Sequence, residues 1–386
     1  MQMKKINVIC PTFRFKEDST IRKIGIYYLI KSLISKKNIR LCIIDSSPKP
    51  LEIFERDKSI YGNIIYIYIP NKIEAIKRYK KLFPQAMDFC ITNNHQNFKK
   101  YLEIVKAWDY FIPWDDGYPV ELSLEKQFLS SRPSIGMKRN MAIAALEETF
   151  GAGDIVCYAD DDDFRDENYF SSMSNLIRNY DYVRISKWLT CNFREETTMP
   201  VCGFHNLKLH KDANNYWIPG ISKDMKLYNS QTNKSYDLLV KNRYSKLKCL
   251  AFSPISYEGA MHVFSMNLWK KAVKNFGGIP PISMAEDVLF FTQCKNFLGN
   301  KFHPYLIRNK NFNFLRCAHN NTSVIEWTET IKLDEMPKWA KEKIQYISIL
   351  LCSPQKFDKF QNDIKKLLIR TSKKFSNNAP NSQKLG

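Results

Sequence analysis

Several features are missing from this sequence of 386 residues, and each absence excludes a class of protein. No stretch approaches the roughly eighteen apolar residues of a membrane-spanning helix, and the apolar run before Pro11 is too short for a signal peptide. The ten cysteines are scattered without a C-x-x-C pair, which argues against a structural zinc site and favours a reducing cytoplasm. Internal repeats are also absent. We therefore expect a cytoplasmic protein that is soluble or peripheral to a membrane.

Acidic residues are scarce relative to basic ones. Asp and Glu number 39 against 59 Lys and Arg, so the formal net charge is +20. Such a field attracts phosphates on nucleic acid, anionic lipid or a small substrate. The coding bias of an A+T-rich genome explains the excess equally well, because Lys, Asn, Ile, Tyr and Phe are all plentiful. Charge alone does not identify a partner.

The chain length predicts roughly two domains at about 150 residues each. The first segment reads as strand, helix, strand, with apolar strands that are typical of a parallel sheet covered on both faces. The expected strands are 6–10, stopped by Pro11, then 40–44, 63–69 and 154–159; the expected helices are 19–36 and one from Ser134 to about Glu148. Residues 71–130 and 195–250 read as insertions, the second polar and loop-rich.

The C-terminal residues 328–386 have a different character. Apolar residues recur there at helical spacing, and from 355 onward there are eight Lys or Arg against two Asp. A basic amphipathic helix of this kind is typical of contact with an anionic membrane surface. The alternative is a helix that packs on the main domain and leaves its charged face in solvent.

The strongest chemical signal is YADDDDF at 158–164. Four consecutive carboxylates repel one another, so a fold is expected to keep them together with a compensating cation. Because strand side chains alternate, Asp160 and Asp162 are predicted to share one face. Their hard oxygens suit Mg²⁺ or Mn²⁺. The alternative is a solvated acidic turn.

Three further clusters are individually weaker. Lys138, Arg139 and Asn140 lie in the first turns of the helix after Ser134, where backbone N–H groups and basic side chains suit a diphosphate. Glu286 and Asp287 precede an apolar run, and a carboxylate at a helix start is also an ordinary cap. Arg316 and His319 occur in NFLRCAHNNTS at 313–323.

Taken in order, these motifs resemble the family 2 type of glycosyltransferase with the nucleotide-sugar-binding GT-A fold. The matching segments are NVICPTF (7–13), CIIDSS (42–47), SIGMKRNMAIAA (134–145), YADDDD (158–163), FGGIPPISMAEDVLFF (276–291) and LRCAHNNTS (315–323). The resemblance implies an α/β, Rossmann-like GT-A domain over 1–327 with a mostly parallel central sheet. Residues 328–386 would then form a basic helical extension.

The resemblance also implies roles for individual residues. The residues implied to bind the donor are Pro11, Thr12, Asp45, Arg139, Asn140, Asp160 and Asp161. Those implied to coordinate Mn²⁺ or Mg²⁺ are Asp162, Asp160 and His319. Asp287 would be the catalytic base, with Glu286 as the alternate. Trp114, Asp115, Asp116 and Trp217 in the two insertions are candidate sugar contacts, with burial in a core as the alternative reading for each tryptophan.

The expected activity is metal-dependent, inverting transfer of a sugar from a nucleotide-sugar donor to a hydroxyl of a glycan or glycolipid. The setting would be surface polysaccharide or glycolipid synthesis at the inner face of the cytoplasmic membrane. One alternative is a metal-dependent nucleotidyltransferase or polymerase, which also needs clustered Asp residues. The sequence lacks a glycine-rich G-x-x-x-x-G-K-[ST] loop, and we expect no nucleic-acid partner. The other alternative is a non-catalytic carbohydrate-binding protein on the same fold.

Overall fold

The architecture comes from a computed structural model. It describes residues 4–14, 19–54, 58–83, 133–166, 168–185, 187–193, 201–206, 210–212, 215–217, 226–229, 234–237, 262–280, 286–307, 314–318, 329–330 and 335–378.

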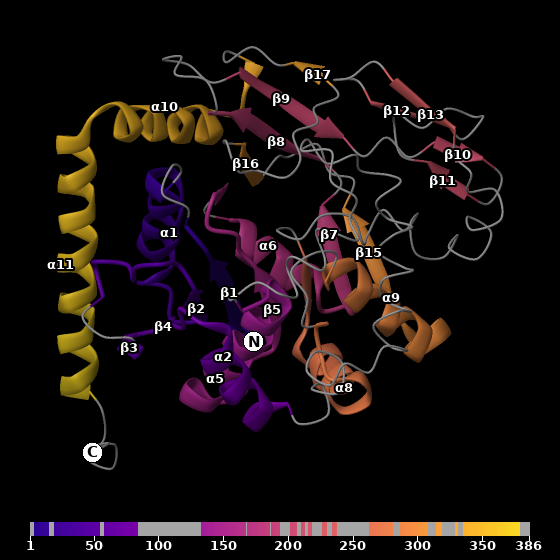
Figure 1. The fold of residues 1–386 in the computed structure, drawn as a ribbon, viewed down its shortest axis with the longest axis horizontal. Coiled ribbons are helices and arrows are strands. Elements are labelled where there is room, and N and C mark those ends of the chain that lie inside the picture. The colour runs from indigo at the N-terminus through magenta and orange to yellow at the C-terminus, as the bar shows by residue number, and fades with distance from the viewer. Residues whose placement is uncertain are drawn as a thin grey trace.

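The centre of the molecule is an eight-stranded sheet (Figure 1). In spatial order its strands are β15 (Pro304–Ile307), β7 (Tyr182–Ile185), β14 (Val263–Ser265), β5 (Ile155–Tyr158), β1 (Ile6–Thr12), β2 (Ile39–Asp45), β4 (Ile64–Tyr68) and β3 (Lys58–Tyr61). Only β14 and β3 run against the other six. The sheet is therefore mostly parallel, as the apolar strands predicted.

Both faces of the sheet are covered, because the strands are apolar on both sides. Along β1, Val8 and Cys10 point into one core and Ile9 into the other. The first core contains side chains from α1 (Ser19–Leu33), α6 (Tyr169–Leu176), α10 (Lys338–Cys352) and α11 (Pro354–Asn378). The second contains side chains from α2 (Lys72–Leu82), α5 (Ile135–Phe150), α8 (Met266–Phe276) and α9 (Glu286–Leu298). This is a three-layer α/β arrangement.

Strand β1 does not stop at Pro11, which corrects the expectation from the sequence. It continues to Thr12, with Pro11 opposite Ile44 of β2. The pairing of β1 with β5 ends at Ile9, opposite Tyr158. Pro11 therefore lies where β1 has one neighbouring strand instead of two, and its missing N–H is tolerated there.

The two expected insertions also contain regular structure. Helix α2 begins at Lys72, within the first of them, and buries Tyr79 and Phe83 in the second core. The second contains β9 (Val201–Asn206) and two hairpins, β10 (His210–Asp212) with β11 (Asn215–Trp217) and β12 (Lys226–Asn229) with β13 (Lys234–Asp237). Strand β9 belongs to a five-stranded sheet ordered β17 (Glu329–Thr330), β9, β8 (Lys187–Asn192), β16 (Phe314–Ala318) and β6 (Asp163–Arg165).

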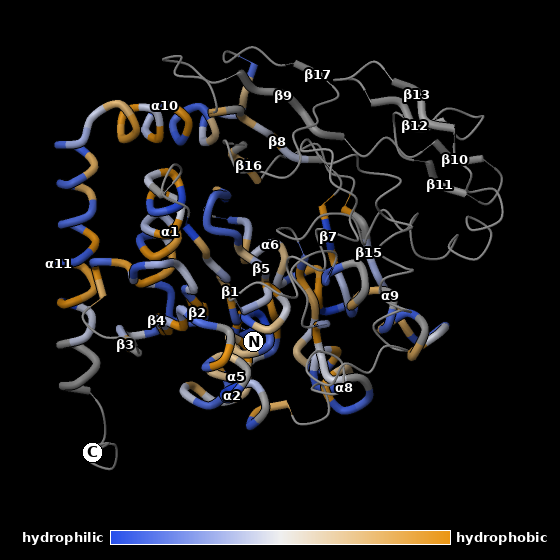
Figure 2. The backbone as a smooth tube through the Cα atoms, viewed as in Figure 1, coloured by the Kyte–Doolittle hydropathy of each residue, from blue (hydrophilic) through white to orange (hydrophobic). Residues whose placement is uncertain are grey.

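The C-terminal helices pack on the domain. Helix α11 runs beside α1 and β3, and α10 crosses the end of α1 (Figure 1). Tyr28 contacts Tyr346 of α10 and Phe360 of α11 edge-on or tilted, with ring centroids 5.5 and 5.6 Å away. Hydrophobic and hydrophilic residues alternate along α11 (Figure 2), and its apolar residues Ile364 and Leu368 are buried. Within the described residues, no helix is both long and apolar enough to cross a membrane.

Candidate functional site

The strand order reverses at β1, and this reversal defines where a ligand is expected. From β1 the chain proceeds through β2 to β4 on one side, and then returns to form β5 on the other. In open α/β sheets, ligands bind outside the carboxyl ends of the strands at such a switch point. Here those ends carry Thr12, Asp45 and the aspartates that follow Tyr158. The antiparallel strand β14 adds His262, whose carbonyl accepts the Tyr158 N–H at 3.0 Å.

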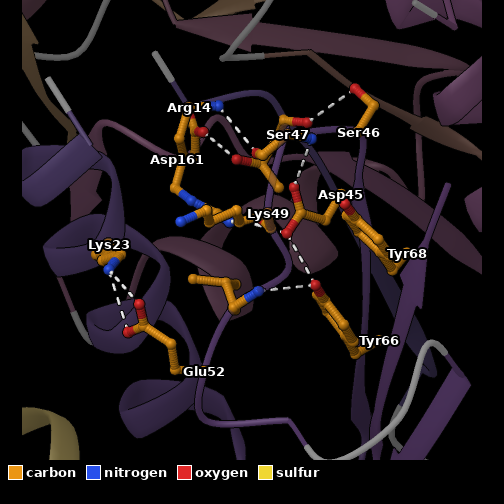
Figure 3. Close-up of polar contacts among 12 residues, drawn as sticks. Arg14, Lys23, Asp45, Ser46, Ser47, Lys49, Glu52, Tyr66, Tyr68 and Asp161 are labelled. Carbon is orange, nitrogen blue, oxygen red and sulfur yellow. Dashed lines mark hydrogen bonds and ion pairs between the residues drawn. The ribbon is translucent and has the colours of Figure 1, made fainter. Parts of the chain in front are cut away.

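Asp45 at the end of β2 is enclosed by hydrogen-bond donors (Figure 3). Arg14 Nη1 lies 2.9 Å from its Oδ2, and the Tyr66 hydroxyl donates to the same oxygen at 2.8 Å. The Ser47 N–H donates to Oδ1 at 2.9 Å. Arg14 also donates to the Lys49 carbonyl at 2.6 Å. Asp45 is fully buried, so its observed role is to anchor the β1 and β2 ends.

Lys138, from the first turns of α5, joins the same two strand ends. Its Nζ donates to the Thr12 carbonyl and to Ser46 Oγ, both at 3.1 Å. Burial lowers the pKa of Lys138 to about 8, against the opposite pull of Asp161 and Asp45. Ser134 caps α5 through the Met137 N–H at 3.3 Å, and Gly151 ends it. The helix expected from the sequence is thus confirmed, and it places Lys138 against the carboxyl ends of β1 and β2.

The four aspartates after β5 alternate in exposure. Asp161 and Asp163 are buried, whereas the side chains of Asp160 and Asp162 are 34% and 15% exposed. Asp161 accepts hydrogen bonds from Thr12 and Arg22, and burial raises its pKa to about 6 despite Arg22. Asp160 lies beside Arg139 of α5 and Asp162 beside Arg22 of α1, so the predicted pairing of the two on one face stays a prediction.

Close packing holds this aspartate loop against α1. A Cβ on Gly25 would overlap the backbone carbonyl of Asp161, so only glycine fits at this point of α1. Arg22, one turn earlier, also lies 3.5 Å from Asp162. Helix α1 thus supplies both the close approach and a positive charge.

The carboxylates that face outward suit a hard cation. In the described part of the chain no group of three or more His, Cys, Asp or Glu side chains is placed to hold a metal ion. Asp160 and Asp162 nevertheless provide two oxygen-donor groups, and Mg²⁺ usually takes one or two carboxylates together with substrate phosphates. The donor set fits Mg²⁺ or Mn²⁺. His319, the expected third ligand, lies outside the described residues.

Arg139 connects the aspartate loop to the start of α9. Its guanidinium contacts Glu286, lies 3.4 Å from Asp160, and stacks 3.9 Å from the ring centroid of Tyr158. Burial raises the pKa of Glu286 to about 7, although Arg139 pulls it downward. For Arg139, burial favours the neutral form, but Glu286 and its neighbours raise the pKa above its ordinary value. Arg139 therefore stays charged, and its positive charge balances a negative charge on Glu286.

The neighbouring carboxylate, Asp287, has a different partner. His262 Nε2 lies 3.2 Å from Asp287 Oδ2, and His262 Nδ1 lies 2.5 Å from the Tyr182 hydroxyl. His262 is fully buried. The sequence analysis missed His262 and Tyr182. The available signal was a single histidine before the apolar VFS of β14, which is the usual pattern of a core histidine.

Asn140 occupies an internal position. Its Nδ2 donates to the Tyr79 hydroxyl at 2.8 Å and to the Ile279 carbonyl at 2.7 Å. Its Oδ1 accepts from Trp269 Nε1 and from the Ile279 N–H, both at 3.0 Å. A Cβ on Gly278, at φ +87°, would lie 2.7 Å from this oxygen. The amide uses all four hydrogen-bonding positions to fasten α2, α8 and the 276–280 turn to α5.

The structure thus brings most of the expected residues to one edge of the sheet. Those present are Pro11, Thr12, Asp45, Arg139, Asp160, Asp161, Asp162, Glu286 and Asp287, whereas the Asn140 amide bonds Tyr79, Trp269 and Ile279 in the interior. Trp114, Asp115 and Asp116 lie outside the described residues, as do the side chain of Trp217 and all of His319. The role of each residue toward a donor or metal remains a prediction.

No protein-family model matches the sequence, and no curated protein matches it significantly. Among solved structures, S. aureus TarS 1–349 is similar at 13% identity, covering 89% of this chain and 70% of that one, with a TM-score of 0.38. The same protein in complex with UDP-GlcNAc gives 12% identity, 88% and 70% coverage and a TM-score of 0.36. Against a longer TarS chain the identity is 12%, with 81% of this chain and 37% of that one covered, and a TM-score of 0.35. Likeness at this level carries no argument about function.

Proposed function

We propose that this protein is a glycosyltransferase that moves a sugar from a nucleotide-sugar donor to a hydroxyl acceptor by inversion, with Mn²⁺ or Mg²⁺. The observation that supports it best is the division of carboxylates at the sheet edge. Asp160 and Asp162 are the partly exposed members of the aspartate loop, and Arg139 lies between Asp160 and Glu286. Such transfer needs one site for a leaving diphosphate and one base for the acceptor.

Asp160 and Asp162 would hold the metal ion. When bound, that ion supplies charge neutralisation of the leaving diphosphate. Arg139, whose charge is assured by Glu286, lies beside Asp160 and would add positive charge at the same place. Thr12 and Asp45 would close the nucleotide end of the site, where Lys138 holds the two strand ends together.

Asp287 would take the proton of the acceptor hydroxyl. Glu286, which contacts Arg139 and whose pKa burial raises to about 7, is the alternate base. Asp287 instead faces the imidazole of His262. A single base opposite the leaving group suits displacement in one step, which inverts the anomeric carbon.

A hydrolysis and binding screen tests the proposal. UDP-, GDP-, dTDP- and CMP-sugars would be offered with Mn²⁺ or Mg²⁺, including UDP-GlcNAc, which is bound in a TarS crystal structure. We expect one nucleotide to be released in a metal-dependent manner, with the loss of at least about 100-fold in Asp162→Asn. The matched control is Asp358→Asn, which changes an exposed carboxylate on α11. NMR of the released sugar would show the inverted anomer.

Failure would be equally clear. If no nucleotide sugar is hydrolysed and none raises the melting temperature with either metal, the glycosyltransferase proposal is wrong. If activity survives both EDTA and Asp162→Asn, the proposed dependence on a metal ion is wrong. If the released sugar retains the anomeric configuration of the donor, the proposed inverting mechanism is wrong.

A peripheral membrane location, in glycolipid or surface polysaccharide synthesis, is part of the same proposal. The apolar face of α11 is buried on the domain, so its contact with lipid would be electrostatic. Lys365 and Lys366 lie on its exposed face. Changing both to Gln should weaken sedimentation with anionic liposomes, whereas the matched pair Lys271→Gln and Lys274→Gln on α8 should not. Equal binding of both variants would contradict the location.

A further inference from the structure

Helix α1 carries a line of three residues that leads from the aspartate loop to the C-terminal helices. Arg22, Gly25 and Tyr28 are three positions apart, so each lies beside the next on the helix surface. Arg22 contacts Asp161 and lies 3.5 Å from Asp162. One turn along, a Cβ on Gly25 would overlap the backbone carbonyl of Asp161. The position of α1 therefore determines the position of the loop.

The ring of Tyr28, at the other end of this line, lies where three elements meet. It packs edge-on against Phe164 of β6, with 5.4 Å between the ring centroids. Tyr346 of α10 and Phe360 of α11 lie 5.5 and 5.6 Å from it on the same measure. Nζ of Lys343, also on α10, lies 4.1 Å from the centre of the ring. One side chain thus touches both C-terminal helices and the strand that follows the aspartate loop.

Phe360 anchors α11 on the same side of α1. Its buried ring lies 6.1 Å from that of Tyr27 and 5.8 Å from that of Tyr346. Nζ of Lys31 lies 5.8 Å from the centre of the Phe360 ring. Helix α11 runs along α1 here, and α10 crosses its end (Figure 1). Because close-packed interiors transmit displacements, a change in this aromatic contact moves α1.

The aspartate loop needs such external support, because neighbouring carboxylates repel one another. Asp161 is buried and accepts hydrogen bonds from Thr12 and Arg22. Asp160 and Asp162, on either side of it, are partly exposed. Holding Asp161 in place therefore fixes where the other two carboxyl groups begin.

We propose that Tyr28 is a positioning residue, through which helices α10 and α11 hold α1 against the aspartate loop and keep the metal-binding carboxylates in place. This inference rests on the proposed function, in which Asp160 and Asp162 hold Mn²⁺ or Mg²⁺. Tyr28 takes part in no bond-making step and acts through Gly25 and Phe164. The C-terminal extension is thereby a working part of the transfer site.

The test compares Tyr28→Leu, Phe360→Leu and Tyr28→Phe with the wild type, each in the full chain. The first two remove one ring from the contact between α1 and the C-terminal helices, whereas the third keeps every ring. The matched control is Phe150→Leu. Phe150 is also half-buried with a cation facing its ring, since the guanidinium of Arg40 lies 5.6 Å from the centre. It ends α5 and lies beside the start of β2, away from the aspartate loop.

Two measurements do not depend on turnover. We expect Tyr28→Leu to weaken the binding of Mn²⁺ alone by about 10-fold in calorimetry, and Phe360→Leu by about 3-fold, since changes behind the ligands of a metal lower its affinity. Tyr28→Phe and Phe150→Leu should stay within about twofold of the wild type. Hydrogen exchange of a peptide covering residues 159–165 should become faster in the two variants that weaken binding and stay unchanged in the control.

Turnover gives a third comparison, with the nucleotide sugar that the wild type hydrolyses. A higher concentration of Mn²⁺ should restore most of kcat to Tyr28→Leu, because its carboxylates are displaced and not missing. The same concentration should not restore Asp162→Asn, which lacks one of them. Tyr28→Phe should keep the wild-type dependence on Mn²⁺.

The outcomes distinguish this inference from the function on which it rests. If Tyr28→Leu and Phe360→Leu bind Mn²⁺ as the wild type does, the positioning role is wrong and the glycosyltransferase proposal stands. An equal loss of Mn²⁺ affinity in Phe150→Leu also overturns it, because the effect is then one of general destabilisation. A wild type that binds no Mn²⁺ and hydrolyses no nucleotide sugar overturns both. If Tyr28→Leu does not fold, Phe360→Leu decides the question.

Discussion

At the end of β2, a single carboxylate accepts hydrogen bonds from an arginine, a tyrosine and a backbone N–H. At the start of α9, two neighbouring carboxylates have different partners. Asp45 is bonded by Arg14, Tyr66 and Ser47. In the second region Arg139 pairs with Glu286. The tyrosine there, Tyr182, contacts His262, and His262 lies 3.2 Å from Asp287.

The difference separates an anchor from a candidate base. Arg14, Tyr66 and the Ser47 N–H hold the Asp45 carboxylate in place at the ends of β1 and β2. Asp45 is also fully buried. Asp287 lies against the imidazole of His262 instead, and we propose it as the base that takes the acceptor proton. Four substitutions test this contrast, from the largest expected effect to the smallest.

Asp287→Asn should have the largest effect on activity. Without the carboxylate no base remains opposite the leaving group, so kcat for donor hydrolysis should fall by about 10²–10⁴-fold. Nucleotide-sugar affinity, measured by calorimetry, should change little. Retention of wild-type kcat would assign the base elsewhere, with Glu286 as the next candidate.

Asp45→Asn should act mainly on stability. It leaves the buried guanidinium of Arg14 without its carboxylate, and breaking a buried ion pair from one side costs about 3–5 kcal/mol. The free energy of unfolding from urea titration would show the loss. The double variant Asp45→Asn with Arg14→Met should recover part of it, because the buried charge is gone. An Asp45→Asn protein as stable as the wild type would show that the anchor is dispensable.

Lys138→Met should change how stability depends on pH. The pKa of Lys138 is lowered to about 8 in the folded chain, so between about pH 8 and 10.5 the unfolded chain holds more protons. The contribution of Lys138 to stability is therefore present above pH 10.5 and is lost as the pH falls through 8. Relative to Lys138→Met, the wild type should gain about 3 kcal/mol across this interval. Parallel stability–pH curves for the two proteins would contradict the burial of the ammonium group.

Tyr66→Phe should give the smallest effect. It removes the donor to Asp45 and the acceptor for the Leu51 N–H at 3.0 Å. We expect a loss of about 1–3 kcal/mol in the free energy of unfolding. At saturating donor, kcat of the folded fraction should stay within about twofold, whereas Asp287→Asn lowers it. A Tyr66→Phe protein that lost kcat as Asp287→Asn does would show that the Asp45 cluster is more than an anchor.

Much of the fold follows from local signals. Ser134 and Gly151 bound α5 as a cap and a terminator, and the apolar strands form a sheet buried on both faces. The alternating exposure of the four aspartates has another cause than the strand geometry expected from the sequence, because Asp161 and Asp162 form a turn between β5 and β6. The strand through Pro11 was not predictable, because its tolerance depends on where the pairing with β5 ends.

Periodicity and capping act over a few neighbouring positions, so the order of amino acids alone specifies which elements form and which segments carry carboxylates and basic residues. Which carboxylate meets which partner depends on tertiary contacts. Arg139 and Glu286 are 147 positions apart, and Tyr182 and His262 are 80 apart. No local preference specifies such contacts. They arise because the carboxyl ends of β1, β2 and β5, the start of β14 and the start of α9 meet at one edge of the sheet, where burial makes each choice of partner energetically decisive.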